Sequence, residues 1–222
     1  MNKNSIRIKR IVGVSLLCAL TFILQFVIAP IMPKIPIAGG IAINLALIPV
    51  VVGAILYGPI GGLIVGLVLG LITLMPGQGA EGFMQSPYLI FLTITLCLAK
   101  TGLAGLIAGL LFKIISKQHY VVAVIVSAII APIINTGIFL ILYGYLMHLL
   151  TGGTYFEAYA LMIIPTLLAF SAELLINIIL SPSIATMILK ITRKYKLGFT
   201  TDFDQFRQNK EVNKDDSLSW CW

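Results

Sequence analysis

The sequence predicts an all-α integral membrane protein, folded as a bundle of six transmembrane helices with both termini in the cytoplasm. Of the 222 residues, 59% are hydrophobic and only 10% are charged. A soluble domain has about 25% charged residues, so this chain has too few charges to cover a surface exposed to water. Long apolar runs recur along it, and a helix needs roughly 20 such residues to cross a bilayer.

Proline and glycine divide the apolar sequence into helices. Gly58-Pro59 separates the second helix from the third, and Pro76-Gly77 ends the third. The second and third helices are short for a full span, so they either cross obliquely or one is partly re-entrant. Residues 1–196 form the expected transmembrane domain, and the polar segment 197–222 is an expected disordered cytoplasmic tail. The predicted helices are 9–29, 42–57, 61–75, 88–115, 121–149 and 159–191.

The basic residues indicate the orientation. A net charge of +7 could suggest a nucleic-acid partner, but the basic residues cluster at the ends of the apolar runs. Lysine and arginine concentrate on the cytoplasmic side of membrane proteins, so we expect a multi-pass protein of a bacterial plasma membrane with no nucleic-acid partner. The flanking clusters are Lys3, Arg7, Lys9 and Arg10 before the first run, and Lys190, Arg193, Lys194 and Lys196 after the last.

Catalytic motifs are absent from the sequence. It contains no P-loop, GxSxG or HExxH motif, so it cannot use ATP on its own and no enzymatic activity is expected. Its three cysteines form no CxxC pair, and neither a metal site nor a cofactor is expected. A pairing of Glu173 with His148 is all that would support a membrane enzyme, and the two lie at different predicted depths.

Small residues recur four positions apart on three predicted helices. Such faces let helix backbones approach closely in lipid. We interpret those in 61–75 and 88–115 as internal packing, whereas Ser15 and Ala19 on the first helix could face a partner protein. The glycines are Gly62, Gly66 and Gly70, then Gly105 and Gly109.

Polar residues inside the last three apolar runs are candidates for function, since such residues usually face a bundle interior or a cavity. Asn135 shares a helical face with Phe139 and Tyr143, and Glu173 shares one with Asn177. At 1.5 Å per residue, Asn135, Glu173 and Lys100 lie roughly 20 Å from the helix ends, near the middle of the bilayer.

Two interpretations of these polar residues remain open, and both can hold. In the first, Lys100 and Glu173 form a buried ion pair, and the asparagines bond to neighbouring helices. In the second, the polar groups form the floor of an outward-facing pocket for a small amphipathic molecule. Four residues would line that pocket above the floor: Tyr143, Tyr145, His148 and Tyr155.

Two stretches resemble a known family. They are INLALIPVVVGAILYGP at 43–59, which continues into the glycine-rich 62–70 and LITL at 71–74, and NTGIF at 135–139. They resemble the S components of energy-coupling factor (ECF) transporters, and the resemblance extends over 5–195. It implies that the chain captures a vitamin outside the cell and works with a membrane coupling protein and two cytoplasmic ATPases.

The resemblance also implies roles for individual residues. Ser15 and Ala19 would dock the coupling protein, and Asn135, Glu173 and Asn177 would contact substrate beneath a lid formed by 30–40. The remaining expected substrate contacts are Lys100, Tyr143 and Asn44, where Asn44 takes the place of an acidic residue usual in riboflavin carriers.

The expected substrate is pantothenate, within the branch that includes pantothenate, riboflavin and pyridoxine carriers. Lys100 could bind its carboxylate, provided that Glu173 is neutralised. Riboflavin or a pyridoxine-like vitamin is the alternative. An autonomous ion-coupled secondary transporter, with Glu173 as a proton site, is the other alternative.

Overall fold

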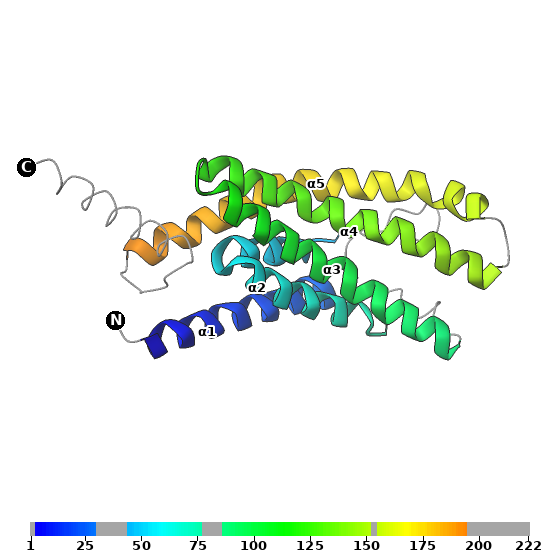
Figure 1. Ribbon diagram of the computed structural model, residues 1–222, viewed down its shortest axis with the longest axis horizontal. Coiled ribbons are helices and arrows are strands. Elements are labelled where there is room, and N and C mark those ends of the chain that lie inside the picture. Colours follow the sequence, from blue (N-terminus) through cyan, green and yellow to red (C-terminus); the bar gives the residue numbers. More distant parts are fainter. Residues whose placement is uncertain (1–2, 30–43, 77–85, 152–154, 195–222) are drawn as a thin grey trace, which may run out of the picture.

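The computed structural model describes residues 3–29, 44–76, 86–151 and 155–194, and helices make up nearly all of them (Figure 1). Helix α1 (Lys3–Phe22) continues into a short π-helix, η1 (Ile23–Ile28). It is followed by α2 (Leu47–Thr73), α3 (Pro87–Ile115), α4 (Tyr120–Thr151) and α5 (Tyr155–Lys194). The predicted all-helical architecture is confirmed for these residues. The lid segment 30–40 and the tail 197–222 lie outside them.

Five helices are long and apolar enough to cross a membrane within the described part of the chain. They are Arg7–Ile28, Leu47–Thr73, Pro87–Ile115, Tyr120–Leu146 and Thr166–Met187. Each exceeds the roughly 20 residues that a spanning helix needs. The prediction of a multi-pass membrane bundle is therefore confirmed, with five candidate spans where six were expected.

The difference in number arises at α2, which contains two of the predicted helices. Gly58 has φ 76°, a left-handed conformation that suits glycine, and Pro59 follows it. A Cβ on Gly61 would lie 3.0 Å from the carbonyl oxygen of Gly53. Residues eight apart in a straight helix are about 12 Å apart along the axis, so the chain bends back sharply here.

The predicted break at Gly58-Pro59 is thus correct, but the two helical segments are short. Segments 47–57 and 59–73 extend about 16 Å and 22 Å at 1.5 Å per residue, less than the ~30 Å of a hydrocarbon core. We therefore count them as one candidate span, and a sixth separate span remains a prediction.

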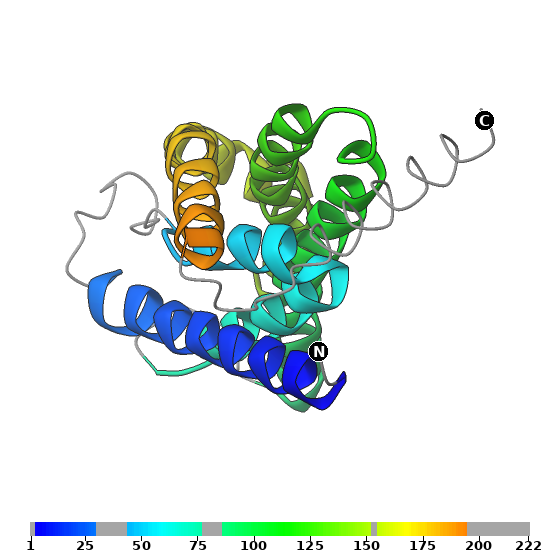
Figure 2. The same ribbon diagram turned by 90° about the vertical axis from the view of Figure 1, so that its left-hand side faces the viewer.

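Helix α2 lies between α1 on one side and α3, α4 and α5 on the other (Figure 2). It is the most buried of the five spans. Its valines Val50, Val51 and Val52 are inaccessible to solvent. Since α2 contacts every other helix, it forms the centre on which the rest of the bundle packs.

Glycines allow α2 and α3 to pack backbone against backbone. A Cβ on Gly70 would lie 2.7 Å from the carbonyl oxygen of Cys97, and one on Gly66 would collide with the carbonyl oxygen of Thr101. Gly62 and Gly105 face each other in the same way. The internal packing predicted for these small residues is confirmed.

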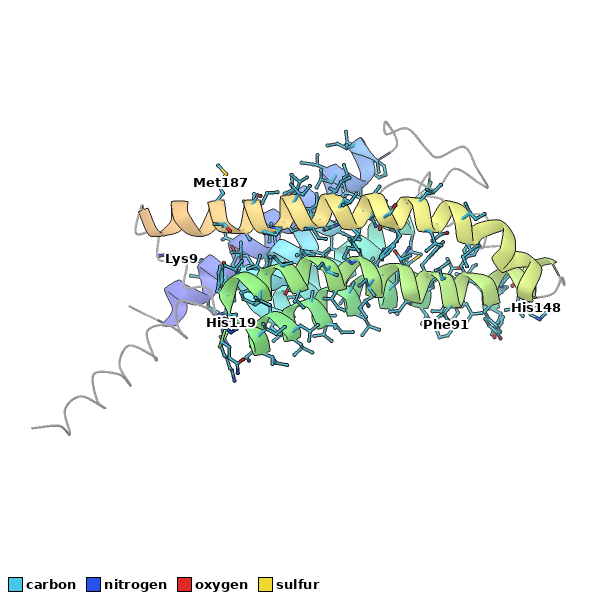
Figure 3. All side chains as sticks on the ribbon, turned by 90° about the horizontal axis from the view of Figure 1, so that it is seen from above. Lys9, Phe91, His119, His148 and Met187 are labelled. Carbon is cyan, nitrogen blue, oxygen red and sulfur yellow. The ribbon has the colours of Figure 1, made fainter. Side chains whose placement is uncertain are left out.

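Labelled side chains mark the two ends of the bundle. Lys9 and His119 lie at one end and His148 at the other (Figure 3). The start of α1, which carries Lys9, and the end of α5 lie at the same end of the bundle (Figure 1). The described residues therefore begin and end on one side of the bundle. That both termini lie in the cytoplasm stays a prediction, which rests on the distribution of basic residues.

Candidate functional site

One face of α5 is buried in the bundle and carries polar groups. Thr166, Glu173 and Asn177 are buried, whereas Leu167 and Leu175 are exposed. This alternation follows the helical period of 3.6 residues, so the polar face predicted from the sequence is confirmed. It turns toward α2 and α4, the helices that α5 contacts.

Glu173 is the central charged group of this face and is only 6% exposed. Its Oε1 accepts a hydrogen bond of 2.9 Å from the backbone N–H of Asn44, just before α2. Its Oε2 is buried and has no hydrogen-bond partner among the residues described. A buried carboxylate oxygen without a partner has a high desolvation cost, and it is a natural position for a ligand.

Lys100 on α3 does not form a direct ion pair with Glu173, so the first of the two interpretations is wrong in that form. The Lys100 ammonium lies instead 5.1 Å from the centre of the Phe139 ring on α4, a cation–π contact. It interacts with Glu173 only electrostatically, at longer range. The ring of Phe139 packs on that of Tyr143, with centroids 4.9 Å apart.

The two asparagines expected to contact substrate differ in their surroundings. Asn135 is buried, and its Oδ1 has no hydrogen-bond partner in the described ranges. Asn177 is 1% exposed. Its Nδ2 donates to the backbone carbonyl of Glu173 at 2.9 Å, and its Oδ1 accepts from Ser181 at 3.2 Å. Asn177 therefore already uses both polar ends within α5, and Asn135 does not.

Further buried side-chain oxygens also have no hydrogen-bond partner in the described structure. Among them are those of Thr93 on α3, Thr166 on α5 and Asn44 just before α2. Other buried hydroxyls behave differently: that of Thr101, for instance, donates to the backbone carbonyl of Cys97. Since nearly all buried polar groups in proteins find partners, these exceptions are candidates for contact with a ligand.

The sequence reasoning missed Thr93. It precedes Lys100 by seven residues and therefore lies on the same face of α3. Following the polar face of α3 from Lys100 back toward the start of the helix by two turns would have identified Thr93. Thr93 and Thr166 both lie closer to the end of the bundle that bears His148 than Lys100 and Glu173 do.

The predicted pocket wall is correct only in part. Tyr143 is buried, as expected, but Tyr145 is exposed and its hydroxyl lies 3.5 Å from that of Tyr88 on the outside of the bundle. Positions two apart on a helix point in nearly opposite directions, so both tyrosines cannot line one pocket. His148 is exposed. The Tyr155 side chain lies outside the described residues.

The outer face of α1 carries the two residues expected to dock a partner. Ser15 and Ala19 are both exposed, and Leu16 beside them is 71% exposed. The opposite face of α1 is buried through Val14 and Leu17. The expected docking residues therefore face away from the bundle.

Comparison with known proteins identifies the family. A family model described as a thiamine transporter protein (Thia_YuaJ) matches residues 11–198, which include four of the candidate spans whole and the first from residue 11 on. The chain belongs to the thiamine transporter family. It is thus a multi-pass membrane transporter for vitamin uptake and not an enzyme, as predicted. No curated protein matches the chain.

Membership of the thiamine transporter family corrects the predicted substrate and branch. The expectation of pantothenate is wrong, because the family is described by thiamine, and the pantothenate, riboflavin and pyridoxine branch is not the one matched. The physical signal was present in the sequence. A buried carboxylate at Glu173 suits a cation such as thiamine and repels an anion such as pantothenate.

Proposed function

We propose that this member of the thiamine transporter family binds thiamine from outside the cell, as the S component of an ECF-type importer driven by a separate ATPase module. The observation that carries the proposal is the buried Oε2 of Glu173, which has no hydrogen-bond partner in the described structure. Thiamine has a permanent positive charge on its thiazolium ring and N–H donors on its aminopyrimidine ring.

The chemistry of the site suits such a ligand. The atoms without hydrogen-bond partners are all oxygens, and those of Glu173, Asn135 and Asn44 can only accept, so they match a ligand that donates. The Phe139–Tyr143 pair offers aromatic faces to a flat cationic ring. The proposed contacts are Glu173, Asn135 and Asn44, with Thr93 and Thr166 closer to the outer end.

The division of labour with an ATPase module rests on two features. The sequence contains no phosphate-binding loop, so ATP hydrolysis must come from other polypeptides. The exposed face of α1 at Ser15 and Ala19 supports docking of a membrane coupling protein. Two cytoplasmic ATPases would complete the module.

Reconstitution tests this proposal. Mass spectrometry of the protein purified without added ligand should detect thiamine as the bound small molecule. Liposomes that contain the protein together with a coupling protein and ATPases should take up thiamine only when ATP is supplied. The ATP must be on the side of the membrane where the ATPases lie. Uptake by the chain alone, driven by a proton or sodium gradient, would instead establish the ion-coupled alternative with Glu173 as its proton site.

A further inference from the structure

We propose that Lys100 is an internal competitor of the vitamin: its ammonium lies over the aromatic ring of Phe139 and must move for the cationic ring of thiamine to stack there. The inference rests on the proposed function and adds a residue that weakens binding and sets the charge preference of the site.

The position of Lys100 supports this role. Its ammonium lies 5.1 Å from the Phe139 ring, which packs on Tyr143. This is the contact that a thiazolium ring would make with the same aromatic pair. Lys100 has no carboxylate partner in the described part of the chain, so its movement breaks no ion pair.

The charge balance points the same way. Glu173 and Lys100 lie near enough to interact electrostatically, and they do not form an ion pair in the described structure. A carboxylate deep in a membrane bundle needs compensation, and the ammonium of Lys100 can supply it to Glu173. When thiamine binds, the positive charge of its thiazolium ring compensates Glu173, and Lys100 then repels the bound vitamin.

Removing the ammonium should therefore strengthen the binding of a cation. Two unit charges several ångströms apart in a partly buried site interact strongly enough to change affinity by about ten-fold. An uncharged ligand of the same shape should not respond. Thiamine and its analogue with a neutral thiophene ring in place of the thiazolium make this comparison possible.

The experiment is a titration of both ligands into the purified protein in lipid nanodiscs. Lys100→Met should bind thiamine about ten-fold more tightly than the wild type, while the affinity for the thiophene analogue should change less than two-fold. Lys100→Gln is a second variant that keeps the site polar, and it should change both affinities in the same way as Lys100→Met. Lys113→Met, which removes an exposed charge from the last turn of α3, is the matched control and should change neither affinity.

Each other outcome has a distinct meaning. If the wild type binds neither ligand, the proposed function fails. If the wild type binds thiamine but both Lys100 variants bind it equally or more weakly, Lys100 does not compete with the vitamin and the inference is overturned. If neither Lys100 variant bound the thiophene analogue, the inference would also be overturned, because Lys100 would then be required for the shape of the site.

Discussion

The backbone N–H of Asn44 donates a 2.9 Å hydrogen bond to Oε1 of Glu173, so the segment that leads into α2 is tied to the buried face of α5. One carboxylate oxygen therefore has a structural role, and the other remains available for a ligand. A backbone group therefore orients the carboxylate, and substitutions at residue 44 other than proline keep that N–H donor. Asn44→Ala should accordingly leave Glu173 in place.

The two asparagines should respond differently to substitution. Asn135→Ala removes a buried acceptor without a hydrogen-bond partner in the described structure, so we expect thiamine affinity to fall about ten-fold with little change in thermal stability. Asn177→Ala breaks two hydrogen bonds within α5 and should lower stability by about 1–2 kcal/mol. Ligand titration and thermal unfolding of each variant separate the two effects. The opposite pattern would show that Asn177, and not Asn135, contacts the vitamin.

Thr93 offers a test of a residue that sequence reasoning overlooked. Thr93→Val keeps the shape of the side chain and removes a buried hydroxyl that has no hydrogen-bond partner among the residues described. We expect weaker thiamine binding and unchanged or slightly higher stability. Thr101→Val is the control, because that hydroxyl donates to the carbonyl of Cys97 and should not affect binding. Equal affinity in the wild type and Thr93→Val would remove Thr93 from the site.

The close packing of α2 on α3 makes a prediction about stability. Gly66→Ala places a methyl group against the carbonyl of Thr101 and should lower the free energy of unfolding by about 1–3 kcal/mol. Gly137→Ala is the matched control on α4, where a Cβ would meet nothing within 4 Å. That substitution should be neutral or stabilising by up to ~1 kcal/mol from helix propensity. Thermal unfolding in detergent measures both, and equal effects would contradict the packing described for Gly66.

The exposed face of α1 should matter for transport and not for binding. Ser15→Leu or Ala19→Leu adds bulk where two helices would need close approach, so thiamine binding should be unchanged while ATP-driven uptake is abolished. Ile179→Leu, on the exposed side of α5, is a control that should not affect uptake. Normal uptake by the α1 variants would show that the coupling protein docks elsewhere.

Much of the fold could be predicted because the composition and the periodicity of a membrane protein's sequence directly indicate its helices. The apolar runs located the helices, and Gly58-Pro59 located the bend within α2. What the sequence could not show was the geometry of that bend. Whether two short segments make one span or two depends on how Gly53 and Gly61 meet in three dimensions.

The candidate site was predictable by position and less so by role. Helical periodicity placed Asn135 and Glu173 inside the bundle, as the structure has them. It could not show that Asn177 bonds within its own helix, because a polar side chain on a buried face can bond to the next turn or to a ligand equally well. Nor could it show that Lys100 lies over Phe139, since contacts between helices depend on their packing.

Glu173 is the proposed partner of the cationic ring of the vitamin, and titration of thiamine into wild-type and Glu173→Gln protein tests this contact. We expect the variant to lose about 10–100-fold in affinity for thiamine, with a much smaller loss for the neutral thiophene analogue. Glu211→Gln, beyond the residues matched by the family model, should bind like the wild type. Equal affinity of the wild type and Glu173→Gln for thiamine would show that Glu173 does not bind the cationic ring.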